Sequence, residues 1–153
     1  MNPILTSIEQ EIKAKIEKFA PELKDTYAKV VLAGDKIMFD TKTHQHMELV
    51  KNPESRKDPV NTVSSGVTGL MWVMYQQTKR KMDNRVLIMA GTAILMHAID
   101  FAERGLGITF SQEMIAEAAQ KLAYNLFKKL GISPEQIDAA VAEGAKQVQG
   151  AQA

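Results

Sequence analysis

The sequence predicts an all-α protein, a bundle of five to six helices built around a central apolar helical hairpin. Apolar residues recur at helical spacing, and no stretch of useful length alternates as a strand does. No formally charged side chain lies between Pro59 and Thr78 or between Val86 and Ile99. The prolines, together with Gly105, Gly107 and Gly131, fall between the periodic segments, where helices begin and end. A chain of 153 residues fits one domain, so we expect residues 1–153 to share one core.

Residues 2–20 are predicted to form an amphipathic helix. Isoleucines at helical spacing line one face, while Asn2 can cap the first turn and Pro3 occupies a tolerated position. Pro21 interrupts this helix, because its ring clashes with the preceding turn and it lacks an N–H. A second helix is expected from Pro21 to about Phe39. The two form a bent pair or one kinked helix.

The pattern is poor between Asp40 and Thr62. Residues 44–50 fit either a short helix or an extended segment. Residues 51–62 contain two prolines and mixed charges, and we expect a surface loop there.

The hairpin is expected over about residues 64–82 and 84–104. Ser64 or Ser65 can cap its first helix, a turn is expected at residues 83–84, and Gly105 can end the second helix. A helix that is apolar nearly all round is buried in protein or in membrane. Other helices of this chain, other copies, or lipid must therefore cover the hairpin.

We expect that this short chain cannot cover the hairpin alone. The expected oligomer-facing or membrane-facing side chains are the following apolar and small residues of both helices: Val67, Leu70, Met71, Met74, Leu87, Gly91, Ile94 and Leu95. Gly66 and Gly69 would allow another backbone to approach closely. A more polar line, which would face water in a ring of copies, consists of Ser65, Thr68, Trp72 and Gln76.

A constitutive transmembrane helix is not expected, because spanning requires about 20 predominantly apolar residues. The uncharged segment 59–78 is long enough but carries several Ser, Thr, Asn and Gln residues, and the apolar run 86–99 is short. The hypothesis that remains is insertion of an assembled ring.

The C-terminal third is predicted to contain two more helices. Thr109 or Ser111 can cap a helix that runs to about Leu130, where Gly131 ends it. Residues 133–136 read as a capping box that opens a last helix with a thin apolar stripe, and residues 149–153 are expected to be a frayed tail.

No catalytic motif stands out, so we expect no enzyme, no cofactor and no metal. The chain has no cysteine. His44 and His46 with Asp40 are the nearest approach to a metal cluster, but a site needs three or four converging donors. His97 and Asp100 form either a proton-sensitive pair, a ring fixed by its carboxylate, or two groups at the solvent end of a helix.

One dense basic segment lies at the expected hairpin tip, and its candidate phosphate-binding residues are Lys79, Arg80, Lys81 and Arg85. They could contact DNA or lipid headgroups through charge neutralisation, or form a solvated tip. The net charge of +1 argues against a dedicated nucleic-acid binder, so any DNA contact is expected to be non-specific.

The portion from Thr62 to Ile132 contains TVSSGVTGLMWVMYQQTK, VLIMAGTAILMHAIDFAE and FSQEMIAEAAQKLAYNLFKKLGI. It resembles small helical virion proteins of tailed phages, some of which are ejection (internal) proteins that assemble a conduit for DNA in the host envelope. The resemblance implies a homo-oligomer, other virion proteins as partners, location in the virion and then the host envelope, and no catalysis. A head–tail connector or minor capsid protein stays open within this class.

A second class of function is compatible with the same residues. A soluble cytoplasmic adaptor or regulator would be a closed bundle, and its hairpin would be wholly covered by the first, second and fifth helices. A hairpin covered completely within a single copy is therefore expected of the adaptor, whereas a hairpin left partly uncovered is expected of the oligomeric virion protein.

Overall fold

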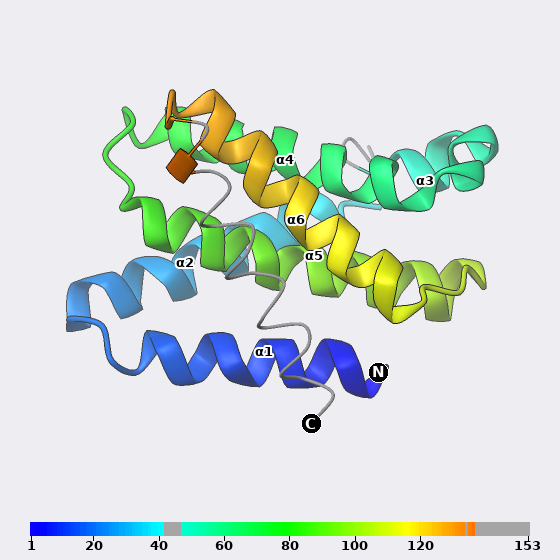
Figure 1. The fold of residues 1–153 in the computed structure, drawn as a ribbon, viewed down its shortest axis with the longest axis horizontal. Helices are drawn as coiled ribbons and strands as arrows, with labels where there is room; N and C mark the ends of the chain where they lie inside the picture. Colours follow the sequence, from blue (N-terminus) through cyan, green and yellow to red (C-terminus); the bar gives the residue numbers. More distant parts are fainter. Residues whose placement is uncertain (42–46, 134, 137–153) are drawn as a thin grey trace.

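The computed structural model describes residues 1–41, 47–133 and 135–136, and its elements are helical throughout this part of the chain (Figure 1). The elements in chain order are α1 (Pro3–Ile16), α2 (Pro21–Met38), α3 (Glu48–Lys51), the 3₁₀ helix η1 (Pro53–Lys57), α4 (Pro59–Gln77), α5 (Asn84–Leu106) and α6 (Gln112–Lys129). The predicted all-α bundle with a central hairpin, α4–α5, is confirmed.

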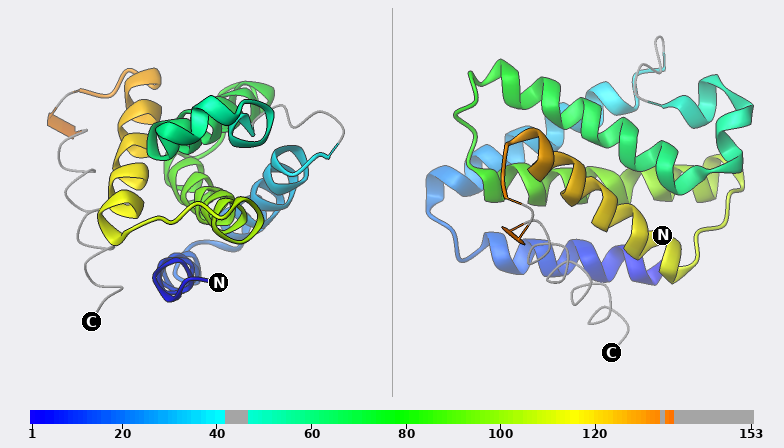
Figure 2. Two further views of the ribbon diagram at one scale, coloured as in Figure 1. Left: turned by 90° about the vertical axis from the view of Figure 1, so that its right-hand side faces the viewer. Right: turned by 45° about the horizontal axis from the view of Figure 1, so that its top comes forward.

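Helix α5 is the axis of the bundle. Viewed end-on, α1, α2, α4 and α6 surround it, and each of these four helices packs against it (Figure 2). Its buried residues are Val86, Leu87, Ala90, Gly91, Ala93, Ile94, Leu95, Met96, Ala98, Ile99, Asp100 and Ala102. This distribution all round the helix explains why the sequence shows no polar face before His97.

The two N-terminal helices form as expected. The Asn2 side chain accepts a hydrogen bond from the Ile4 N–H at 2.9 Å, and Pro3 follows as the first helical residue. Helix α1 ends at Ile16, and α2 begins at Pro21. The chain therefore makes a bent pair of helices rather than one kinked helix.

Helix α4 begins earlier than predicted. Asp58 caps it, accepting a hydrogen bond from the Asn61 N–H at 3.3 Å, and Pro59 is its first residue. Ser64 and Ser65 are therefore not caps, and the expected loop over 51–62 is shortened by η1 and the first turn of α4. A proline that the sequence placed in a loop instead begins a helix, which its fixed φ favours.

Helix α5 begins at Asn84, as predicted, but its C-terminal end differs from the prediction. Asp83 caps the helix rather than forming part of its turn, since its side chain accepts from the Arg85 N–H at 2.8 Å. The helix continues past Gly105 to Leu106, and Gly107, with φ of 70°, is the left-handed residue at its end. Ser111 caps α6, and Gly131, with φ of 75°, follows its end, both as predicted.

Some expectations fall on residues that the structure does not describe. The last helix beyond Gln136 and the tail over 149–153 lie outside the described residues, as do His44 and His46. Of the predicted capping box, the Ser133 hydroxyl accepts a hydrogen bond from the Gln136 N–H at 3.4 Å.

Candidate functional site

The apolar residues expected to face other copies or lipid lie inside a single copy. Val67, Leu70, Met71, Leu87, Ile94 and Leu95 have no exposed surface, Met74 is 6% exposed, and Gly91 is buried. The expectation that they form an outer face is therefore wrong for this conformation. Among the described residues, Val73 is the one large hydrophobic side chain of the hairpin that is exposed.

The cover comes from the amphipathic helices on either side. Helix α1 contributes its isoleucine face, α6 contributes Ile115, Leu122 and Leu126, and α2 packs closely at Gly34. A Cβ built at Gly34 would lie 2.3 Å from Ile94 Cδ1, so any larger residue here would require the Ile94 side chain to shift. Gly69, expected to serve such a contact, has nothing within 4 Å of its added Cβ.

The predicted polar line does not form one solvated face. Ser65 and Gln76 are exposed, whereas Thr68 is buried and donates its hydroxyl to the Ser64 carbonyl at 2.6 Å. Trp72 is half-buried and stacks on Tyr75. A continuous water-facing line along α4 is therefore absent from the closed bundle.

Helix α5 combines membrane-spanning composition with a core position. It has 23 residues, its most apolar 18-residue window has a mean hydropathy of 1.5, and it is the one helix among the described residues that could cross a membrane by length and composition. The short apolar run of the sequence is thus part of a longer helix. Its apolar window is 67% buried inside the bundle, which is also typical of a soluble core helix.

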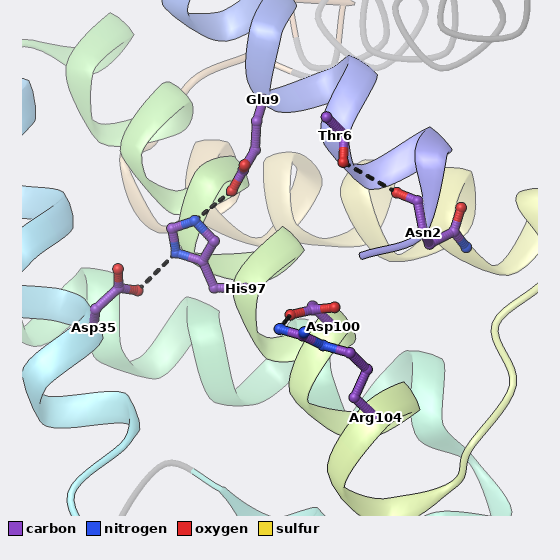
Figure 3. A network of polar contacts seen from close by, with 7 residues as sticks. All are labelled: Asn2, Thr6, Glu9, Asp35, His97, Asp100 and Arg104. Carbon is purple, nitrogen blue, oxygen red and sulfur yellow. Dashed lines mark hydrogen bonds and ion pairs between the residues drawn. The ribbon is translucent and has the colours of Figure 1, made fainter.

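His97 joins three helices where the sequence suggested a pair within one helix (Figure 3). Its Nδ1 lies 2.9 Å from Asp35 Oδ1 on α2, and its Nε2 contacts Glu9 Oε1 on α1. Because both ring nitrogens face carboxylates, only the imidazolium form can donate to both partners. The contact with Asp35 raises the pKa of His97 against the opposing effect of burial, and Glu9 raises it further.

Asp100 does not orient the His97 ring. Its Oδ2 accepts a hydrogen bond from Arg104 at 2.6 Å, one turn along α5. The two alternatives in which His97 and Asp100 pair with one another are therefore wrong, and the partners of His97, Glu9 and Asp35, lie far away in sequence. Tyr27 of α2 lies near both of them, and burial, Glu9 and Asp35 together raise the pKa of its phenol to about 12.

The basic tip forms with unusual backbone geometry. Lys79 and Arg80 both have positive φ, 57° and 62°. Their N–H groups donate to the carbonyls of Gln76 and Tyr75, the pattern of a Schellman motif in which glycine is the usual left-handed residue. Arg85 is engaged by the Asp83 carboxylate at 3.0 Å and is the least available of the four predicted cations.

Residues from outside the predicted basic segment also contribute to the tip. Arg80 and Lys129 lie over the Trp72 ring, with 5.6 and 5.4 Å between each cation and the ring centroid. Lys129 belongs to the C-terminal end of α6, so α4 and α6 together build this end of the bundle. The contact between Trp72 and Lys129 depends on the packing of α4 against α6, so the sequence alone does not predict it.

The described residues contain no group of three or more His, Asp or Glu side chains that could hold a metal ion. No protein-family model, curated protein or solved structure matches this chain. The candidate site is therefore defined by its own geometry: an enclosed apolar hairpin, a three-helix contact at His97, and a basic tip.

Proposed function

We propose that this chain is a non-enzymatic virion protein of a tailed phage, an ejection protein stored as a closed bundle that opens to help form a DNA conduit in the host envelope. The observation that carries the proposal is that the central helix α5 is long and apolar enough to cross a membrane. Its cover by four other helices of the same copy, the expected mark of an adaptor, means that the bundle must open before this helix can act. Amphipathic cover keeps such a helix stable in water, and its removal would create an apolar surface that requires new cover.

In this proposal the hairpin residues act only after the bundle opens. Departure of α1 and α2 would uncover the side of α5 that carries Ile94, which Gly34 now covers. Copies of the chain or lipid would then replace the lost contacts. Homo-oligomerisation, contact with other virion proteins and entry into the host envelope all belong to this open state.

A second function, a soluble cytoplasmic adaptor or regulator, is favoured by the completeness of the cover. Its expected hallmark was a hairpin covered by the first, second and fifth long helices, and α1, α2 and α6 do cover it. A head–tail connector or minor capsid protein would equally retain the closed bundle. The distinguishing property is opening at a bilayer.

A disulfide that locks α2 onto α5 tests the proposal. The Gly34 Cβ position lies 3.3 Å from Ile94 Cγ1, which is where the sulfur of a cysteine at position 94 would lie, so cysteines at both positions would be close enough to form a disulfide. The natural chain has no cysteine to interfere. We expect the reduced Gly34→Cys/Ile94→Cys variant to release dye from vesicles, and the oxidised form to lose most of this activity.

The redox pair is its own control, because one polypeptide is compared in two states. Equal dye release by the oxidised and reduced forms would show that opening between α2 and α5 is not required. Absence of release by the unmodified protein at every concentration would favour the adaptor.

A further inference from the structure

The end of the bundle that holds the α4–α5 turn gathers basic side chains from two separate segments. Five of its exposed cations, here called the basic end, are Lys79, Arg80, Lys81, Lys128 and Lys129. Arg85 is exposed beside them but is paired with Asp83. No acidic residue occurs within 76–82 or 121–133. The chain as a whole is nearly neutral, so this concentration of charge is local.

Trp72 holds the two segments of the basic end together. Arg80 from the turn and Lys129 from α6 both lie over its ring, which offsets part of the repulsion between these like charges. The ring also stacks on Tyr75, with centroids 5.3 Å apart and planes inclined by 25°. Arg80 and Lys129 are thus positioned by contacts with the aromatic pair, in addition to their hydration.

Two of these cations, Lys79 and Arg80, occupy backbone positions that are strained for any residue with a Cβ atom. Lys79 and Arg80 both occupy the left-handed region, where glycine or asparagine would avoid the clash of Cβ with the backbone. Strained backbone of this kind clusters at functional sites, where the particular side chain is needed. Here both residues in the strained left-handed conformation are cationic.

We propose that the basic end is a docking surface for an anionic lipid bilayer. Clusters of Lys and Arg bind acidic headgroups, and a partly exposed Trp beside them is typical of the headgroup level, while Tyr75, on which Trp72 stacks, is itself buried. Nucleic acid fits less well, because single-stranded binding relies on free aromatic faces and the Trp72 ring already contacts Tyr75, Arg80 and Lys129. The inference deepens the proposed function, since docking would precede opening.

Co-sedimentation with vesicles tests the docking surface. We expect binding to vesicles that contain phosphatidylglycerol, and little binding to phosphatidylcholine alone. The turn variant, Lys79→Gln/Arg80→Gln/Lys81→Gln, should bind these vesicles on the order of 100-fold more weakly, since each cation near an anionic surface raises the affinity roughly fivefold. Trp72, the single tryptophan, should be quenched by lipids labelled near the headgroup.

A matched variant controls for net charge. Lys36→Gln/Lys51→Gln/Lys57→Gln removes the same charge from exposed positions outside the basic end and should bind like the unmodified protein. Equal weakening by both variants would overturn the proposal, as would binding to duplex DNA that is lost in the turn variant while vesicle binding is unchanged.

Lys79→Gly separates a structural role from a docking role. Relief of the left-handed strain should raise the midpoint of thermal unfolding by ~3 °C, while vesicle affinity falls about fivefold. A higher midpoint with unchanged affinity would overturn the involvement of Lys79. Vesicle binding without dye release would support the docking surface and contradict the conduit. Dye release that is unchanged in the turn variant would support the conduit and contradict the docking surface.

Discussion

Replacing His97 by glutamine is expected to lower the free energy of unfolding by ~2–3 kcal/mol near pH 6, because one charge-assisted contact to each of two helices is lost. Glutamine leaves Glu9 and Asp35 facing one another without a cation. The three side chains are 29%, 18% and 29% exposed, so solvent screens their interaction only in part. Chemical denaturation of the two proteins measures the difference.

The same contact makes stability depend on pH in a defined direction. The folded-state pKa of His97 is raised, so its contribution is fully present below the unfolded value of about 6.5 and is lost as pH rises through the folded pKa. Tyr27, with a pKa of about 12, stays neutral in this range. Lys13 of α1 lines the same groove.

The difference between the unmodified protein and His97→Gln isolates this titration, because every other titratable group is shared. We expect the stability gap to shrink as the pH is raised above about 6.5. A gap that stays constant, or widens, would show that His97 is not held as an imidazolium between α1 and α2.

Substitution of Gly34 by alanine is expected to destabilise the fold by up to ~2 kcal/mol. The added methyl would meet Ile94 Cδ1 at 2.3 Å inside a packed core, and overpacking typically costs about 1–3 kcal/mol against a helix-propensity gain of ~1 kcal/mol. The variant should also separate α2 from α5 more readily and release vesicle dye faster.

Gly69 supplies the matched control in α4. A methyl there meets no atom within 4 Å, so Gly69→Ala should stabilise the protein by ~0.5–1 kcal/mol through helix propensity alone. Opposite signs for the two substitutions in thermal denaturation would support the close α2–α5 contact. The same sign for both would mean that Gly34 does not make that contact.

The sequence predicted the local features of the fold well. Helical periodicity, the Asn2 cap and the Pro21 break depend on neighbours within one or two turns, and all are found in the structure. The start of α4 was missed because Asp58 and Pro59 suit a loop and a helix start equally. The α5 end was missed because Gly105 and Gly107 are both plausible stops.

The arrangement of the site could not be predicted in the same way. Glu9, Asp35 and His97 lie on three helices, and no local spacing connects them. Lys129 and Trp72 meet only because α4 and α6 pack together. The expectation of an uncovered hairpin failed because an apolar face on α6 and a glycine contact on α2 proved sufficient cover within one chain.

The native mass of the purified protein in detergent-free buffer tests most directly whether one copy shields its own hairpin. The enclosed core predicts a monomer of about 17.0 kDa that remains folded on dilution. An obligate larger assembly that unfolds when diluted would contradict it, because the hairpin would then depend on neighbouring copies for its cover.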